Sequence, residues 1–276
     1  LIVCSVVNII LDLLLILVIP LGVLGAAIAT LIAQAVSAVL VTVTLMYRTE
    51  GMKLCLSQIR MYKRMLQSIL KIGLPAGFEA IMYSISNIIV QVSINNFGVD
   101  TMAAWTAYSK IDFIFWMINS AFGISVMTFV GQNYGAGKWD RIRRGTKICL
   151  GMALISAVSV SIILMSAERF LFGIFVNDAG VVEIGIRMMN VIAPAYLLFA
   201  FIEVFSGALR AQGAVVVSTL ITMVGICVLR MIWVTLVAAH GTLEQVIICY
   251  PITWAAGALA MSIYYIYKQR KIFQAR

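Results

Sequence analysis

Long apolar stretches, each close to or above twenty residues, follow one another along most of this chain. They occupy residues 1–19, 22–46, 69–97, 102–134, 146–167, 182–210, 214–239 and 243–267. About 20 predominantly apolar residues form a helix that crosses the hydrocarbon core of a bilayer. Backbone groups in lipid are satisfied only in helices or closed barrels, and these runs do not alternate as barrel strands do. We therefore predict an all-α polytopic membrane protein with about eight transmembrane helices.

The composition excludes an ordinary soluble domain. Of the 276 residues, 63% are hydrophobic and 11% are charged, whereas a soluble domain carries about 25% charged residues. A soluble core of this size cannot bury so much apolar surface, so we expect the lipid bilayer to be a partner. The five cysteines are scattered without a C-x-x-C pair, and we expect neither a disulfide framework nor a metal site beyond a possible Na⁺.

The net charge of +9 is explained by membrane orientation. Sixteen of the 20 basic residues fall on one side of the predicted membrane, in alternate connections and at the chain end. They are Arg48, Lys53, Arg60, Lys63, Arg64, Lys71, Lys138, Arg141, Arg143, Arg144, Lys147, Arg210, Lys268, Arg270, Lys271 and Arg276. Basic residues concentrate in cytoplasmic connections, so we expect a multi-pass plasma-membrane protein with a cytoplasmic C-terminus and no nucleic-acid partner.

The stretch from Arg48 to Lys71, which we call the basic connector, is the longest break between apolar runs. We predict three parts: the first two helices at 1–47, a cytoplasmic linker at 48–68, and a larger helical bundle at 69–276. The apolar residues Ile59, Met65, Leu66 and Ile69 could form an amphipathic helix on the inner leaflet. The connector could also be a plain linker between two bundles or a solvated loop. Because Leu1 already lies within an apolar run, we expect a piece of a longer protein whose first helices are missing.

Two predicted spans carry acids where lipid disfavours them. At about 100° per residue, Glu79 shares one stripe with Tyr83, Ser86 and Ser93. The next span has a second stripe, formed by Trp105, Tyr108, Asp112, Trp116, Asn119 and Gly123. An ionised carboxylate at the bilayer centre costs at least ~2.5 kcal/mol. Aromatic residues beside an acid are typical of sites for organic cations, so the stripes predict a cavity; packed helix–helix contacts are the alternative.

Other spans contain further candidates. Asn8 and Asp12, four residues apart, could offer oxygen ligands to a proton or Na⁺, or could bridge to a neighbouring helix. Pro194 is expected to bend the sixth span, and Glu203 lies deep in that span. We expect Arg210, at its cytoplasmic end, to extend toward the interface.

Arg230 is a buried cation in the seventh predicted span and needs an anion. Glu203, Glu79 and Asp112 are the candidate partners. A purely structural salt bridge is the alternative reading for both Arg230 and Glu203.

Several motifs resemble the multidrug and toxic compound extrusion (MATE) transporters. The matching segments are NIILD followed by LGVLGAAIATLIAQ, KIGLPAGFEAIMYSISN, NNFGVDTMAAWTAYSKID, SAFGISVMTFVGQNYGAGKWDRIRRG, and AFIEVFSGALRAQG with GICVLRMIW. They cover nearly the whole chain. The resemblance implies twelve helices in two six-helix lobes, of which this chain would hold the last two helices of the first lobe and the complete second lobe.

The resemblance also implies roles for individual residues. The expected cation- or proton-binding residues are Asn8, Asp12, Glu79 and Glu203. The expected substrate-cavity residues combine this resemblance with the polar stripes. They are Tyr83, Trp105, Tyr108, Asp112, Trp116, Asn119, Tyr196, Phe199 and Arg230.

The function that follows is secondary antiport. An H⁺ or Na⁺ gradient would drive the export of amphipathic or cationic small molecules, with no other cofactor, while the lobes rock to give alternating access. A lipid-linked saccharide flippase of the same superfold is one alternative, and it would need a cationic cleft for pyrophosphate. A non-transporting membrane scaffold is another, and it predicts that all acids are paired. No nucleophile–base pair points to an enzyme.

Cysteines introduced at two positions test the predicted topology. We expect a membrane-impermeant thiol reagent to reach Trp139→Cys from the cytoplasm and Asn177→Cys from outside, since the basic connections define the inner side. Labelling of both positions from the same side would contradict the orientation.

Overall fold

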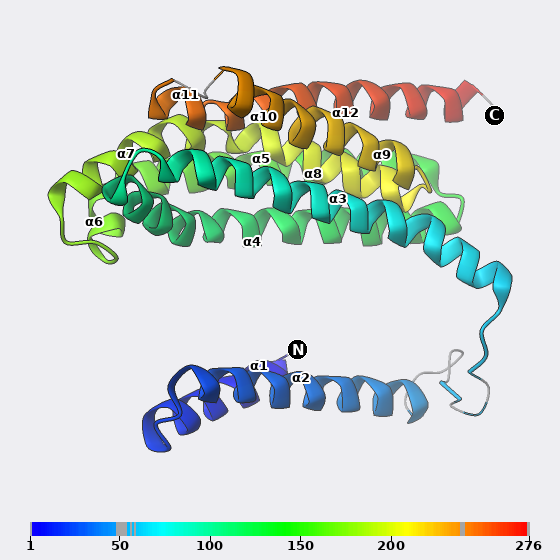
Figure 1. Cartoon of the computed structure of the whole chain (residues 1–276). Coiled ribbons are helices and arrows are strands. Elements are labelled where there is room, and N and C mark those ends of the chain that lie inside the picture. Colours follow the sequence, from blue (N-terminus) through cyan, green and yellow to red (C-terminus); the bar gives the residue numbers. More distant parts are fainter. Residues whose placement is uncertain (1, 48–53, 56, 58, 238–240, 275–276) are drawn as a thin grey trace. The chain divides into compact units, whose positions relative to one another are not determined.

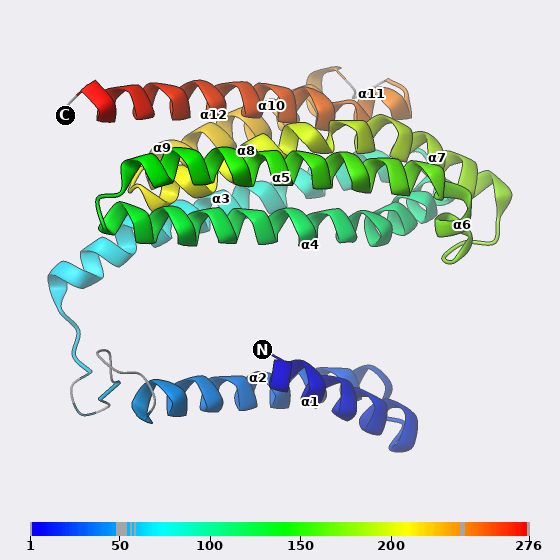
Figure 2. The same ribbon diagram turned by 180° about the vertical axis from the view of Figure 1, so that it is seen from behind.

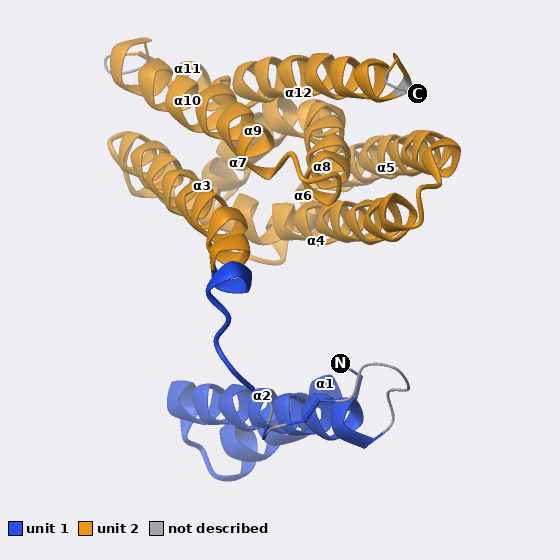
Figure 3. Ribbon diagram, turned by 90° about the vertical axis from the view of Figure 1, so that its right-hand side faces the viewer, with its two compact units in different colours: residues 1–66 blue, residues 67–276 orange. Residues whose placement is uncertain are grey.

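The computed structural model describes residues 2–47, 54–55, 57, 59–237 and 241–274. All the regular structure in these ranges is helical, which confirms the predicted all-α fold. The chain divides into two compact units, residues 1–66 and 67–276 (Figure 3). Part of the predicted linker, residues 48–53, 56 and 58, lies outside the described residues, and the three-part division stays a prediction.

The first unit is a helical hairpin. Helix α1 (Ile2–Asp12) continues into the π-helical segment η1 (Leu13–Val18), and a turn leads to α2 (Gly22–Tyr47). The buried face of α2 consists of Gly25, Ala29 and Ala33, spaced four apart. A Cβ added at Gly25 would lie only 2.8 Å from the carbonyl oxygen of Leu15. Small residues at this spacing let two helix backbones approach closely within a membrane.

The second unit contains the remaining helices (Figure 1). Its three longest single helices are α3 (Lys63–Asn95), which starts at the end of the first unit, α4 (Val99–Gly135) and α5 (Trp139–Ser166). The short α6 (Glu168–Gly173) precedes α7 (Ala179–Ile192), η3 (Ala193–Ala195) and α8 (Tyr196–Ala211). The next span is α9 (Val215–Thr222), η4 (Met223–Val228), α10 (Leu229–Ile232) and η5 (Trp233–Val237). The last is α11 (Leu243–Ile247) with α12 (Cys249–Gln274).

The number of spans agrees with the sequence. Among the described residues, seven helical stretches are long and apolar enough to cross a membrane, and Ile2–Val18 is a shorter apolar helix. The outer faces expose large aliphatic side chains, including Ile155, Ile162 and Ile163 on α5. Such a surface suits lipid rather than water.

Several predicted starts were too late. Helix α3 begins at Lys63 rather than at 69, and α5 begins at Trp139 rather than at 146. A hydropathy reading finds only the part of a helix inside hydrocarbon, whereas these helices continue through their charged ends. The separate amphipathic helix of the connector is also wrong, because Ile59 is not helical while Met65, Leu66 and Ile69 belong to α3.

Helix α8 is the centre of the second unit. It packs against α4, α5 and α12, and α4 and α5 lie side by side (Figure 2). Its residues Tyr196, Ala200, Val204 and Ala208, spaced four apart, are all 0% exposed. The adjoining turn η3 contains Pro194, which confirms the predicted interruption of this span. Proline removes a helical hydrogen bond and thereby separates α7 from α8.

The contact between α4 and α8 depends on two glycines. A Cβ added at Gly207 would lie 2.8 Å from the carbonyl oxygen of Gly123 and 2.9 Å from Cγ1 of Val126. The first of these neighbours is backbone and cannot move without shifting a helix. Gly207 therefore fixes how closely α8 approaches α4, and with it the position of every α8 side chain that faces α4.

Alanine substitutions test this contact. We expect Gly207→Ala to destabilise the protein by about 1–3 kcal/mol, the usual cost of overpacking a core, and to lower the apparent melting temperature in detergent. Gly131→Ala on α4 is the matched control, because its added Cβ would meet only Ala211 Cβ at 4.0 Å. Alanine favours helix over glycine by about 1 kcal/mol, so the control should be neutral or stabilising. Equal melting temperatures for the two variants would contradict the close approach.

Candidate functional site

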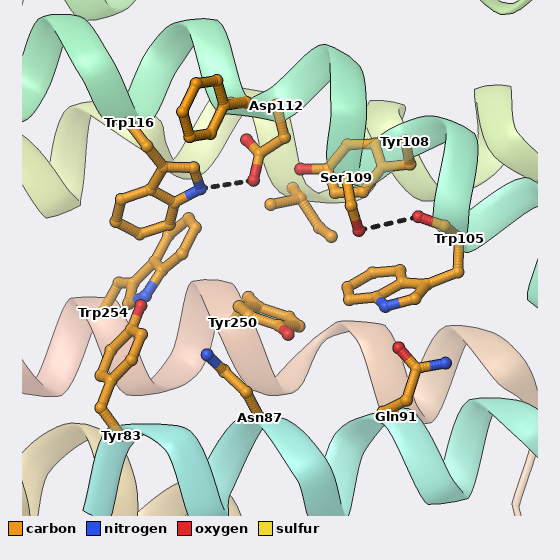
Figure 4. A pocket seen from close by; sticks show the side chains of 12 residues that line it. Tyr83, Asn87, Gln91, Trp105, Tyr108, Ser109, Asp112, Trp116, Tyr250 and Trp254 are labelled. Carbon is orange, nitrogen blue, oxygen red and sulfur yellow. Dashed lines mark hydrogen bonds between the residues drawn. The ribbon is translucent and has the colours of Figure 1, made fainter. Parts of the chain in front are cut away.

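An aromatic cavity of about 410 Å³ lies inside the second unit, between α3, α4 and α12 (Figure 4). Residues Tyr83, Asn87 and Gln91 come from α3, four apart on one face. The remaining wall residues come from three other helices. Helix α4 contributes Trp105, Tyr108, Ser109, Asp112, Phe113 and Trp116, α7 contributes Ile192, and α12 contributes Tyr250 and Trp254. The cavity is thus an aromatic enclosure with one carboxylate.

The structure brings five of the nine predicted cavity residues to this wall. They are Tyr83, Trp105, Tyr108, Asp112 and Trp116. The other four pack around it. Tyr196 contacts Asp112 from behind, and Phe199 lies against the rings of Trp116 and Trp254, with centroids 4.7 and 5.4 Å apart. Asn119 is 3% exposed and Arg230 is fully buried, and neither lines the wall.

Asp112 is held by neutral donors. Trp116 donates its indole N–H to Oδ2 at 2.5 Å, and the hydroxyl of Tyr196 donates to Oδ1. The hydroxyls of Tyr108 and Tyr196 are 3.1 Å apart, which extends the hydrogen-bonded chain. Among the described residues, Asp112 takes part in no ion pair. These donors orient the carboxylate without cancelling its charge, so the cavity retains an acidic group.

A second polar site joins α3, α8 and α9. Arg210 donates from Nη2 to both carboxylate oxygens of Glu79, at 2.6 and 2.8 Å, and Thr219 donates to Oε2 at 2.9 Å. The expectation that Arg210 extends to the interface is therefore wrong. The charge-assisted hydrogen bonds to Glu79 direct the guanidinium toward α3 instead. Glu79 and Arg210 also line a cavity of about 390 Å³, which shares Tyr83 with the aromatic cavity.

Glu203 lies on the face of α8 that meets α4. It is seven residues, or about two turns, before Arg210 and hence on the same side of the helix. A Cβ added at Gly123 would stand 2.8 Å from Cδ of Glu203, so the carboxyl group occupies the space that this glycine leaves. Within the described residues Glu203 forms no ion pair. The structural salt bridge considered for it is absent there.

Arg230 does not have the carboxylate partner expected from the sequence. Its guanidinium lies over the ring of Tyr250, 4.2 Å from the centroid, and 5.8 Å from that of Tyr83. It donates to Oδ1 of Asn87 at 3.1 Å and to Oγ1 of Thr253 at 3.5 Å. No ion pair to it occurs in the part of the chain that the structure describes. Aromatic faces attract the cation, so tyrosines and an amide replace the acid.

Asn8 and Asp12 lie in the first unit and are both partly buried. Asn8 Nδ2 and Asp12 Oδ1 are buried and have no hydrogen-bond partner among the described residues. Buried polar atoms of this kind call for a partner such as water or an ion. The bridge to a neighbouring helix does not form with either atom there, and ion binding by this pair stays a prediction.

A match to the sequence profile of the MatE family covers residues 75–236. This range includes Glu79, Asp112, Glu203 and Arg210, but not Tyr250 and Trp254 of the aromatic cavity. The chain belongs to the MatE family. It is therefore a multi-pass membrane protein of a transporter family, and the expectation that it is not an enzyme is confirmed.

Two curated relatives show which proteins this MatE chain is similar to. It is 27% identical over 260 residues to the probable multidrug resistance protein YoeA of Bacillus subtilis, covering 91% of this chain and 56% of that protein. It is 22% identical over 246 residues to human multidrug and toxin extrusion protein 1, covering 83% and 41%. The chain thus spans about half the length of these curated relatives.

Solved structures share the fold of the MatE chain. An outward-facing multidrug resistance MATE family transporter superposes with a TM-score of 0.89 at 18% identity, covering 98% of this chain and 61% of that one. This likeness confirms the MATE-like fold. It also agrees with the predicted extent, since a chain with eight of twelve helices would cover part of such a structure.

Sequence reasoning missed several residues of the site. Asn87 and Gln91 continue the stripe of Tyr83 at intervals of four, and Tyr250 and Trp254 repeat that interval in the last span. This spacing was visible in the sequence. The pairing of Arg210 with Glu79 was not, because the two residues are 131 positions apart.

The Glu79–Arg210 pair should contribute measurably to stability. Removing one partner of a desolvated pair leaves an unpaired charge, at a cost of about 3–5 kcal/mol for full burial. The side chain of Arg210 is 31% exposed, so we expect less, about 1–3 kcal/mol, for Glu79→Gln. A double-mutant cycle with Arg210→Gln, followed by thermal unfolding in detergent, measures the coupling.

The exposed pair Arg169–Glu183 is the control for this cycle. Its side chains are 80% and 50% exposed and 3.6 Å apart, and exposed pairs contribute about 0–1 kcal/mol. Glu183→Gln should therefore change stability little. A Glu79→Gln effect as small as that of Glu183→Gln would show that the inner pair is not a stabilising contact.

Proposed function

We propose that the full-length protein is a secondary antiporter of the plasma membrane that exports amphipathic or cationic small molecules in exchange for H⁺ or Na⁺. Family membership and the names of its relatives as multidrug resistance and extrusion proteins support this role. The concentration of basic residues supports a cytoplasmic C-terminus. In a completed first lobe of the full-length protein, Asn8 and Asp12 would bind a coupling ion.

The observation that carries this proposal is the charge of Asp112 within an aromatic cavity. Its donors Trp116 and Tyr196 are neutral, so a bound organic cation would be its counter-charge. The faces of the surrounding rings also attract cations. A flat aromatic cation would therefore gain a charge-assisted contact and ring stacking together, while an apolar neutral compound would gain only burial.

Coupling would use the second polar site. Glu79 is occupied by Arg210, and Glu203 lies on the same face of α8 without an ion pair among the described residues. A proton or Na⁺ that binds one of these carboxylates would compete with Arg210 or release it. Tyr83 lines both cavities, so a change around Glu79 has a direct path to the aromatic cavity. The ion and the substrate could then exclude one another without sharing a carboxylate.

The alternatives fit this arrangement less well. A scaffold predicts acids in closed pairs, whereas Asp112 faces a cavity and has no ion pair in the described ranges. A pyrophosphate-binding flippase predicts cations on the cavity wall. The wall contains Asp112 and no arginine or lysine, and Arg230 is buried behind it.

Two substitutions in the full-length protein separate binding from coupling. We expect Asp112→Asn to weaken ethidium binding to the purified protein by about tenfold, the typical worth of a contact to a charged group. We expect Glu203→Gln to leave ethidium binding intact but to abolish drug resistance in sensitive cells without loss of expression. Asp100→Asn is the matched control, since it removes an exposed acid at the start of the same helix α4. Full resistance with Glu203→Gln would remove Glu203 from the mechanism.

A further inference from the structure

The aromatic cavity has two polar groups on opposite sides, Asp112 and Asn87, which we call its two poles. We propose that Asn87, held by the buried Arg230, is a specificity-determining donor, so that the cavity selects dipolar substrates that combine an aromatic cation with a carboxylate. This inference rests on the proposed export function and adds a substrate class to it. Asp112 would meet the cation, and Asn87 the carboxylate.

Arg230 is an unusual cation for a membrane interior. It is 0% exposed, lies over the ring of Tyr250 and has no ion pair within the described part of the chain. Its Nε is buried and has no hydrogen-bond partner among the residues that the structure describes. A buried charge without a counter-ion is costly, and aromatic faces and neutral acceptors offset only part of that cost. Its surroundings are therefore electropositive and favour an anion nearby.

Asn87 connects the positively charged Arg230 to the cavity wall. Arg230 donates from Nη1 to Asn87 Oδ1 at 3.1 Å. An arginine can only donate, so this contact fixes which end of the amide faces the guanidinium. The NH₂ group of Asn87 is then left as a donor, and Asn87 lines the cavity. Asn87 itself is exposed, while its partner Arg230 is buried. Consecutive hydrogen bonds polarise one another, so donation from Arg230 makes the amide N–H groups better partners for a negative oxygen.

The two poles belong to different helices. Figure 4 shows Asp112 on α4 and Asn87 on α3, on opposite sides of the cavity, with Tyr250 between them in this view. Gln91 is the next amide along α3, but its NH₂ group donates to Asn95 at 2.8 Å, and no contact joins it to Arg230. Of the two amides on this wall, Asn87 is therefore the one polarised by a cation.

A matched pair of dyes tests the inference on the purified full-length protein. Pyronin Y is an aromatic xanthylium monocation without an acceptor group, and tetramethylrhodamine is the same cation with a carboxyphenyl substituent. Fluorescence anisotropy gives the dissociation constant of each. We expect Asn87→Leu, of similar size, to weaken tetramethylrhodamine binding about tenfold and pyronin Y binding less than twofold. Gln67→Leu, an exposed amide of the same helix α3 outside the cavity wall, is the control, and it should change the affinity for each dye by less than about twofold.

A second variant removes any ambiguity from misfolding. Asn87→Asp retains a partner for Arg230, and a carboxylate there would pair with it, so the bundle should remain folded. The new acid replaces the donor with a negative group, and tetramethylrhodamine should now bind at least about tenfold more weakly relative to pyronin Y than in the unchanged protein.

The outcomes separate the two proposals. If Asn87→Leu weakens both dyes equally, or if Asn87→Asp leaves the dye ratio unchanged, Asn87 has only a structural role and the inference is overturned, while cation export stands. If Gln67→Leu shifts the dye ratio as strongly as Asn87→Leu, the assignment to Arg230 and Asn87 is also overturned. If the unchanged protein binds neither dye, the proposed function and this inference fail together.

Discussion

Lipid offers no hydrogen-bond partners, so the polar side chains of a membrane bundle have to satisfy one another. That constraint organises the second unit. Glu79 is satisfied by Arg210 and Thr219, which ties α3 to α8 and α9. Asp112 is satisfied by Trp116 and Tyr196, which ties α4 to α8. In each case a contact made for solvation also fixes the relative positions of helices.

The two acids differ in whether a positively charged partner neutralises their negative charge. Glu79 meets a full positive charge, so its site is close to neutral and an arriving cation has to displace Arg210. Asp112 meets only neutral donors, so its negative charge is directed into the cavity. Competition at the first acid and attraction at the second are the two properties on which the proposed exchange of ion for substrate depends, and Tyr83 lines both cavities.

Close helix contacts make this arrangement possible. Gly123 gives Glu203 its space and also receives Gly207, so one point on α4 serves both packing and an acidic side chain. Small residues have this double use in membranes because they admit a neighbouring backbone. Gly25 has the packing role alone in the hairpin of the first unit, where it meets Leu15.

The sequence by itself determined the all-α fold, the number of spans and two polar stripes, one with Tyr83 and the other with Tyr108 and Asp112. These features follow from hydropathy and helical periodicity, which are local and readable from spacing. Only the tertiary structure decided the partners of the charges. Arg210 was expected to reach the interface and instead pairs with Glu79, while Arg230 was expected to find an acid and instead lies on Tyr250. Helical spacing shows which residues share a face, but which faces meet depends on packing between spans far apart in the chain.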